Sequence, residues 1–184
     1  MGIKRFCVKT DLIENGGFEA GLEPWITTGT VSVLPAVVDQ FPAVRPHEGG
    51  FLAQLEPGSS ISQTIEDLVC PNMVYRLGIF LSSPNIDFSI DISDNSGTNV
   101  SVQFIDIMGN PLGTPDEFNV LAFTQDTNGE GGWNYHQLLT SLSPNGTTGA
   151  IVTIRTNTLE EDPIAFNQTP NGIRVDDVSF IREN

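Results

Sequence analysis

Apolar and polar residues alternate along this chain in short stretches that are separated by turn residues. Such period-two alternation places one face of a strand in a core and the other in solvent. The predicted strands are Val31–Leu34, Phe51–Leu55, Ser60–Ile65, Val74–Leu81, Ile86–Ile92, Asn99–Ile107, Phe118–Phe123, Trp133–Leu139, Ala150–Arg155 and Ile173–Ile181. No stretch shows the periodicity of an amphipathic helix. We therefore expect an all-β fold of about ten antiparallel strands, either a β-sandwich or a barrel.

Turn signals lie between the predicted strands. Asn-Gly pairs, which favour tight chain reversals, occur four times, and Gly and Pro cluster between them. A chain of 184 residues is long enough to bury one core without disulfides or metal ions as additional supports. We expect an N-terminal arm over residues 1–11 and a single domain over residues 12–184.

The charge of the chain is strongly acidic and unevenly distributed. There are 8 Lys and Arg residues against 23 Asp and Glu residues, for a net charge of −15. This balance argues against a nucleic-acid or anionic-membrane partner, because phosphate groups need clustered basic side chains. Lys4, Arg5 and Lys9 place three of the basic residues in the first ten positions. A basic arm therefore precedes an acidic body, which favours contact between the two, within one molecule or between neighbours.

The two cysteines, Cys7 and Cys70, are too far apart in sequence for a C-x-x-C metal or redox motif. Three states stay open: a bond to each other, two free thiols, or a link between subunits. Cys7 is the better placed for a link, because it lies on the arm. The residues expected to join identical chains into a homo-oligomer are Lys4, Arg5, Phe6, Cys7 and Lys9.

Signals for export and groups for catalysis are both scarce. Met1–Thr10 has charges but no apolar segment of a secretory signal, and no stretch reaches the ~18 apolar residues of a membrane span. Only His47 and His136 are candidates for a base near neutral pH. No Gly-x-Ser-x-Gly, Walker or dinucleotide-binding motif is present. We therefore expect no conventional export, no membrane partner and no enzymatic activity.

Aromatic residues provide a candidate glycan site. Sugar rings stack on exposed aromatic faces, for which Trp and Tyr are best suited. Tyr75 starts an apolar strand and is not a candidate. Trp133 and Tyr135 share one face of a predicted strand by period two. They form the candidate glycan platform, with inward packing of both as the alternative.

Carboxylates gather near both ends of the chain, at Glu19 and at the pair Asp176 and Asp177. A fold that lays the first and last strands side by side would bring them together. Ca²⁺ takes six to eight oxygen ligands from carboxylates and backbone carbonyls, and further ligands are expected in His47–Phe51, where Glu48 lies beside a Gly-Gly pair. The alternative is that Glu19 is a solvated turn residue and the Asp pair accepts backbone N–H groups.

Four motifs give the chain a family resemblance. They are Asn15–Gly21 with the following Pro24–Trp25, then Gly49–Leu55, Ser60–Ile65 and Val175–Phe180. Together they resemble the carbohydrate-binding-module type of galactose-binding-like jelly roll, over residues 12–181. They also resemble the domain that precedes collagen-like triple repeats in surface proteins of spore-forming Firmicutes. The resemblance implies that the fold is a jelly-roll β-sandwich, in which Trp25 has a core or edge-packing role.

The resemblance also implies a structural Ca²⁺ ion and a place of action. The implied ligands are the Gly17 carbonyl, Glu19, Glu48, a carbonyl near Phe51, and Asp176, with Asp177 as the other candidate of the pair. From all this we expect a non-catalytic, self-assembling structural subunit of a bacterial cell or spore surface, joined through its N-terminal arm. Spore-surface proteins are made inside the mother cell, so they need no export signal. The alternative is a free-standing, lectin-like carbohydrate-binding module whose partner is a glycan.

Overall fold

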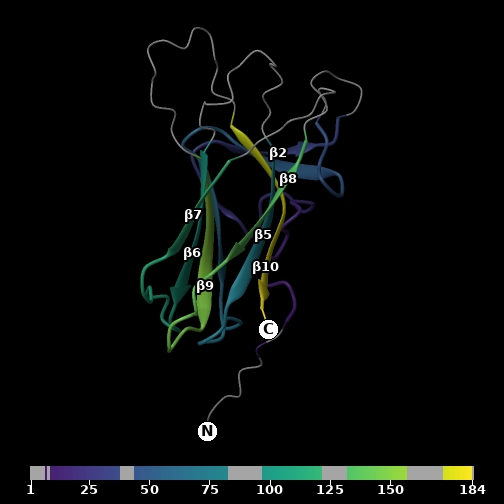
Figure 1. The fold of residues 1–184 in the computed structure, drawn as a ribbon. Helices are drawn as coiled ribbons and strands as arrows, with labels where there is room; N and C mark the ends of the chain where they lie inside the picture. The colour runs from purple at the N-terminus through teal and green to yellow at the C-terminus, as the bar shows by residue number, and fades with distance from the viewer. Residues whose placement is uncertain are drawn as a thin grey trace, which may run out of the picture.

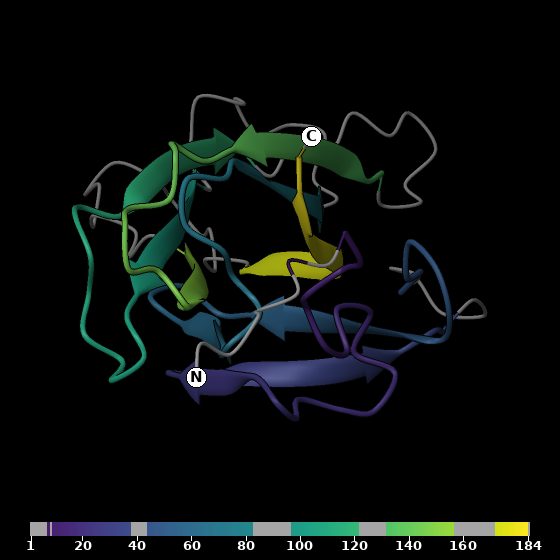
Figure 2. The same cartoon turned by 90° about the horizontal axis from the view of Figure 1, so that it is seen from below.

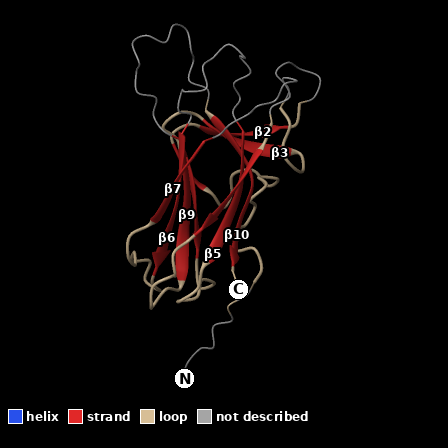
Figure 3. Cartoon of the chain, viewed as in Figure 1, coloured by secondary structure: helices blue, strands red, loops and turns tan. Residues whose placement is uncertain are grey.

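The computed structural model describes residues 7, 9–37, 44–82, 97–121, 132–156 and 172–183, and within these it is an antiparallel β-sandwich without helices (Figure 1 and Figure 3). The described strands are β1 (Ile26–Thr28), β2 (Val31–Pro35), β3 (Phe51–Leu55), β4 (Ser60–Ile65), β5 (Tyr75–Ser82), β6 (Gly97–Ile105), β7 (Asp116–Leu121), β8 (Asn134–Leu139), β9 (Gly149–Thr156) and β10 (Ile173–Arg182). They form two five-stranded sheets: the β9 sheet, with the order β1-β4-β9-β6-β7, and the β10 sheet, with the order β2-β3-β10-β5-β8.

The two sheets face each other across one apolar core. Alternate residues of the central strands point into it, including Leu77, Ile79 and Leu81 of β5 and Val100 and Val102 of β6, all fully buried. Each fully buried side chain of this kind stabilises the fold by about 1.5–3 kcal/mol relative to an exposed one. The period-two pattern therefore decides which face of each strand enters the core, and the other face of the β10 sheet is left for a site.

The beginning and the end of the chain lie side by side. β10 lies in the middle of its sheet, and Figure 2 shows the N-terminal segment, in purple, next to this yellow strand. The Leu12 N–H donates to the Phe180 carbonyl at 2.9 Å, and the Val178 N–H donates to the Gly16 carbonyl at 3.1 Å. Asp11 Oδ1 accepts from the Phe180 N–H at 2.8 Å. These contacts place the turn after Gly16 beside the acidic segment of β10.

The prediction of an all-β sandwich is confirmed, and of the two architectures left open by the strand pattern the chain adopts the two-sheet one. Nine of the ten predicted ranges overlap strands β2 to β10. The other range, Ile86–Ile92, lies outside the described residues. β1 was not predicted, because all three of its residues are exposed and its sequence offers no alternation to detect.

The arm is fastened to the body by a disulfide between Cys7 and Cys70. Arg182 Nη1 also donates to the Cys7 carbonyl at 2.9 Å. The end of β10 lies beside the strand that follows Cys70, since the Glu183 N–H donates to the Val74 carbonyl at 2.9 Å. An arm that runs alongside β10 to its end therefore lies next to Cys70. Of the three states left open by the sequence, the structure has the bond between Cys7 and Cys70. Free thiols and a Cys7 link between subunits are therefore wrong.

The other residues expected to join subunits are only partly described. Lys9 is exposed, whereas Lys4, Arg5 and Phe6 lie outside the described residues. The boundary between arm and domain at residue 11, and the homo-oligomer itself, stay predictions. Among the described residues no helix is long and apolar enough to cross a membrane.

Candidate functional site

Asp176 in β10 holds the start of the loop His47–Phe51, which leads into β3. Its Oδ2 atom accepts from the backbone N–H of His47 at 2.7 Å and of Glu48 at 3.4 Å, and its Oδ1 atom accepts from the N–H of Asp177 at 2.9 Å. The side chain is fully buried. Burial, and then the charge of Asp177, raise the pKa of Asp176 to about 6, although the N–H donors act in the opposite direction. The protein therefore compensates the charge of this carboxylate only in part.

Glu19 holds the end of the same loop. Its Oε1 atom accepts from the backbone N–H of Gly50 at 2.8 Å and of Phe51 at 3.1 Å. Gly49, between the two carboxylate-bound ends, has a φ of +65°, and a Cβ atom there would collide with the Glu19 carboxylate. A glycine meets both demands because it has no Cβ. Glu19 and Asp176 thus seat one loop from opposite ends of the sequence.

The turn that presents Glu19 is built around a buried ring. Phe18 has a φ of +57°, is fully buried, and packs against Trp25 with ring centroids 5.7 Å apart. The side chain of Asn15 stabilises the turn through hydrogen bonds to the backbone of Ala20, Gly21 and Glu23. Because Phe18 is fixed in the core, the residues on either side of it, Gly17 and Glu19, are directed toward the loop.

A β-bulge brings both aspartates to the same side of β10. In a regular strand neighbouring side chains point to opposite faces. Here the pairing of β10 with β5 shifts between Asp176 and Ser179, and Asp177 has a φ of +45°, a conformation that costs a non-glycine residue about 1–3 kcal/mol. As a result Asp177 Oδ2 lies 2.6 Å from His47 Nδ1, next to the contacts of Asp176. A Cβ atom at Gly17 would lie 3.3 Å from Asp177 Oδ1.

Carboxylates from distant parts of the chain meet at this loop. The structure brings the turn of Gly17 and Glu19, the loop of Glu48, and the two aspartates together. Within the described ranges, no three His, Cys, Asp or Glu side chains gather closely enough to hold a metal ion by themselves. A cation would therefore need backbone carbonyls as well, a mixed oxygen set that suits Ca²⁺. The under-compensated charge of the buried aspartate also favours a divalent cation.

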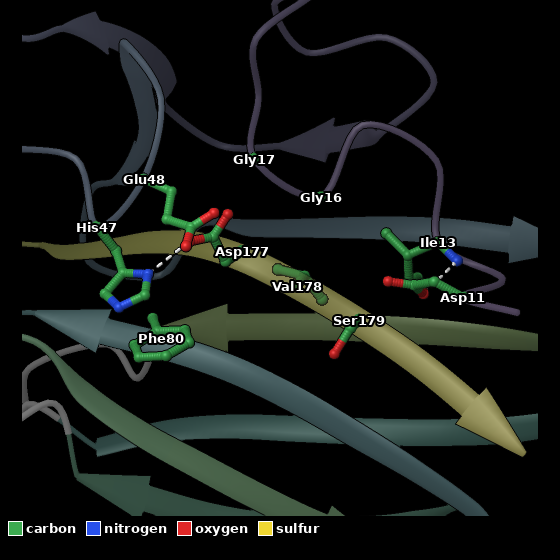
Figure 4. A pocket seen from close by; sticks show the side chains of 10 residues that line it. All are labelled: Asp11, Ile13, Gly16, Gly17, His47, Glu48, Phe80, Asp177, Val178 and Ser179. Atoms are coloured by element: carbon green, nitrogen blue, oxygen red, sulfur yellow. Dashed lines mark hydrogen bonds and ion pairs between the residues drawn. The ribbon is translucent and has the colours of Figure 1, made fainter.

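A cavity of about 440 Å³ opens beside this cluster on the outer face of the β10 sheet. Its volume lies in the range of ~300–1,000 Å³ that is usual for small-ligand sites. Figure 4 shows the imidazole of His47 over Phe80 with Glu48 and Asp177 near it, while Asp11 and Ile13 lie at the other end. The described residues that line the cavity include no Lys or Arg. The cavity thus offers hydrogen-bond acceptors and an aromatic wall.

Four rings form a row along the outer face of the β10 sheet. Trp133 meets His47 edge-on with centroids 6.4 Å apart, His47 stacks on Phe80 at 3.5 Å, and Phe80 packs against Tyr135 at 4.8 Å. Trp133 Nε1 donates to the Arg45 carbonyl at 3.0 Å. The two residues of the sequence-based glycan platform therefore lie at the two ends of one aromatic row.

Tyr135 reaches from β8 across the neighbouring strand β5, where a glycine leaves room for its side chain. A Cβ atom at Gly78 would lie 2.8 Å from the Tyr135 hydroxyl oxygen, 3.2 Å from its Cε2, and 2.6 Å from Ser179 Oγ. The hydroxyl end of the Tyr135 ring thus extends over β5 toward β10. The side chain is 49% exposed, so part of the ring is accessible to a ligand.

Phe80 was not recognised as a site residue from the sequence, and His47 was named only as a candidate base and within the range His47–Phe51. The signal for Phe80 is present: it lies out of phase with Leu77, Ile79 and Leu81, which enter the core, so the alternation places its large ring on the outer face. His47 carries no such signal, since its place over Phe80 depends on the seating of its loop by distant carboxylates.

No protein-family model and no curated protein matches the chain, whereas solved structures match its fold. One is a family 61 carbohydrate-binding module in complex with β-1,4-galactotriose, at 17% identity over 94% of this chain and 99% of that chain, with a TM-score of 0.55. Modules of families 16 and 22 match as well. These neighbours agree with the galactose-binding-like jelly roll inferred from the sequence, while a link to collagen-like or spore proteins is not shown.

Other similar structures belong to enzymes. A Stig cyclase from Fischerella sp. matches at 17% identity over 95% of this chain and 98% of that chain, with a TM-score of 0.62. The enzymatically active domain of bacteriophage CBA120 tailspike protein 4 matches at 17% identity over 95% of this chain, which spans 22% of that chain, with a TM-score of 0.64. At such identities the likeness shows the fold alone, because one fold hosts many functions.

Proposed function

We propose that the chain is a carbohydrate-binding module that holds a glycan on the outer face of its β10 sheet, across β8, β5 and β10. The observation that carries this proposal is Tyr135, whose half-exposed ring reaches over Gly78 and packs against Phe80, a residue in the wall of a polar cavity. A flat aromatic face stacks on the apolar face of a pyranose ring. The structural likeness to carbohydrate-binding modules supports the proposal at the level of fold.

The chemistry of the cavity favours a neutral sugar. Glu48, Asp177 and Asp11 supply carboxylate oxygens that accept hydrogen bonds from sugar hydroxyl groups, and Ser179 can donate or accept. A glycan with carboxylate or sulfate groups would meet like charges here, in a chain of net charge −15. Polar groups beside a stacking ring fix the orientation of a ligand. We therefore expect the ring of a neutral sugar on Tyr135 and its hydroxyl groups toward the cavity.

The proposed module is non-catalytic and acts at a bacterial cell or spore surface, where polysaccharides are exposed. The imidazole of His47 contacts Asp177 at 2.6 Å and stacks on Phe80, and the proposal assigns it to the wall of the cavity. The similar modules favour glycan binding over the self-assembling subunit expected from the sequence. Cys7, which the sequence offered as a link between subunits, is bonded within the chain.

We expect Tyr135→Ala to weaken glycan binding at least tenfold, a loss of about 1.4 kcal/mol, because the stacking face is removed. Calorimetric titration would start with β-1,4-galactotriose and xylohexaose, the ligands of two similar structures, and continue with a panel of neutral and acidic polysaccharides. Tyr135→Phe keeps the ring and should retain most of the affinity. Ile26→Ala, at an exposed position of the β9 sheet, is the matched surface control. Lack of binding to every glycan tested would contradict the proposal.

We also propose that a structural Ca²⁺ ion stabilises the loop beside the cavity. The residues that would hold it are the Gly17 carbonyl, Glu19, Glu48, the Phe51 carbonyl, Asp176 and Asp177. When bound, the ion would supply positive charge beside Asp176, a carboxylate that the protein compensates only in part. The support comes from the convergence of two segments, the Glu19 turn and the aspartates of β10, on the Glu48 loop.

Glu19→Gln should remove most of the stabilisation by calcium and leave the calcium-free protein almost unchanged. The amide oxygen can still accept the N–H groups of Gly50 and Phe51, so the substitution removes charge and little else. Calcium that binds only the folded state raises the free energy of unfolding by about 2.7 kcal/mol at a hundredfold excess over its Kd. Thermal melts in calcium and in chelator measure the difference, with Glu117→Gln on the exposed face of β7 as control. An equal loss in both conditions would assign Glu19 to packing alone.

A further inference from the structure

The end of the sandwich that carries Cys70 has an exposed surface that is both apolar and acidic. Ile107 is 70% exposed and Met108 82% exposed at the tip of the β6–β7 connection. They border a cavity of about 200 Å³ whose lining also contains the carboxylates of Glu66, Asp67 and Asp106. The described lining residues include no Lys or Arg. We call these five residues, together with the exposed Leu68 that follows them in the chain, the end patch.

The end patch is a preformed surface. The Val69 N–H donates to the Thr148 carbonyl at 3.2 Å, and the Thr148 N–H donates to the Ile105 carbonyl at 2.9 Å, so neighbouring connections are tied together. Asp106 accepts from the Met108 N–H at 2.8 Å, which fixes the tip. Its hydrogen bonds with Asn110 hold the pKa of Asp106 below its ordinary value, so this carboxylate is ionised at neutral pH.

We propose that residues 1–6 of the same chain dock on the end patch. This segment, MGIKRF, carries the apolar side chains of Ile3 and Phe6 and the basic side chains of Lys4 and Arg5. The apolar groups match Ile107 and Met108, and the basic groups match the three carboxylates. The cavity is smaller than the ~300 Å³ at which small-ligand sites usually begin. It therefore suits a side chain of a docked segment better than a free ligand.

The disulfide places the segment within reach. Cys7 is bonded to Cys70, which follows Asp67 by three positions. Six extended residues span up to about 20 Å, enough to cross from Cys70 to the end patch. A tether of this length gives residues 1–6 an effective concentration in the millimolar range at the end patch. The same segment of a neighbouring molecule would compete equally only if the protein itself were at a similar concentration. The tether therefore selects the chain's own segment, independently of any glycan bound on the β10 sheet.

Hydrogen exchange of the intact, disulfide-bonded protein tests this docking. A variant in which residues 2–6 are deleted, with Met1 joined to Cys7, should exchange the amides of Leu68, Met108 and Gly109 at least about fivefold faster than the full chain. Lys4→Glu combined with Arg5→Glu should have the same effect, and salt should weaken protection in the full chain. Lys9→Glu is the matched control, because this exposed residue lies outside the docking segment. Unchanged exchange at the end patch after the deletion overturns the proposal.

A second measurement tests the same contact by changing the end patch and following the exchange of the docking segment. Ile107→Ser combined with Met108→Ser changes only exposed side chains, so the fold should persist, and the amides of residues 3–6 should exchange several-fold faster. Light scattering in the same samples should give a monomer. Protection of the end patch that rises with protein concentration, together with a dimer, would show that a second copy supplies the segment and would overturn docking within one chain.

Discussion

Phe18→Ala should lower the free energy of unfolding by about 3–5 kcal/mol, the range for removing a buried aromatic ring from a core. The ring is fully buried, and it is the anchor that the turn between Asn15 and Trp25 places in the core. Removing it leaves a cavity that the turn cannot fill without moving Glu19 away from the loop it holds. Urea denaturation in the presence of chelator measures the loss without a contribution from calcium.

The conformation of this turn makes the measurement specific. Phe18 has a φ of +57°, and alanine bears the same backbone cost at a positive φ, so the difference reports the ring and not the strain. Phe18→Leu should lose less, because it fills part of the space. The Ala variant should also gain less stability from calcium than the natural protein, since Gly17 and Glu19 flank the ring. A loss below about 1 kcal/mol would mean that the hydrogen bonds of Asn15 hold the turn alone.

The strands were largely predictable because alternation is a local property of the sequence. β5 shows this well, since Leu77, Ile79 and Leu81 enter the core while Gly78 and Phe80 lie on the outer face. β1 was missed for the same physical reason: its three residues are all exposed, so no face is distinguished from the other.

The meeting of distant carboxylates at one loop was predictable from the sequence, and their geometry was less so. Glu19, Glu48 and Asp176 were named from motifs at three places in the chain, and the structure places them around one loop. The bulge in β10 was not predictable, because strict alternation would send Asp176 and Asp177 to opposite faces. The bulge depends on pairing with β5 and on the turn at Gly16, whose carbonyl accepts the Val178 N–H.

The glycan platform and the disulfide depend on contacts that local patterns do not contain. Trp133 and Tyr135 were named from their spacing, but the reach of Tyr135 over Gly78 follows from the register in which Tyr135 pairs with Phe80. The pairing of Cys7 with Cys70 follows from the docking of the first segment along β10. Such register and docking relations arise from the whole fold, so a single sequence leaves them open.

Loss of the disulfide should destabilise the protein by about 2–4 kcal/mol. The bond joins residues that are 63 positions apart, and closing a loop of that length lowers the entropy of the unfolded chain by an amount worth about 4 kcal/mol at 25 °C. This figure assumes that the folded protein holds both cysteines in place without the bond. Cys70 is buried in the body, whereas Cys7 accepts a side-chain hydrogen bond from Arg182, and the backbone pairing of the arm with β10 is seen at Leu12. The unbonded arm would therefore regain freedom in the folded state, which reduces the loss.

Cys7→Ser and chemical reduction should give the same loss, and together they identify its cause. Cys7 is only partly buried, so serine adds little cost of its own, whereas Cys70→Ser would also place a hydroxyl group in the core. Reductant should destabilise the natural protein and leave Cys7→Ser unchanged. The natural protein should also run as a monomer on a non-reducing gel, because both sulfurs are used within one chain. If reductant leaves the melting temperature of the natural protein unchanged, the protein does not contain this bond. The tether that brings residues 1–6 to the end patch would then be absent as well.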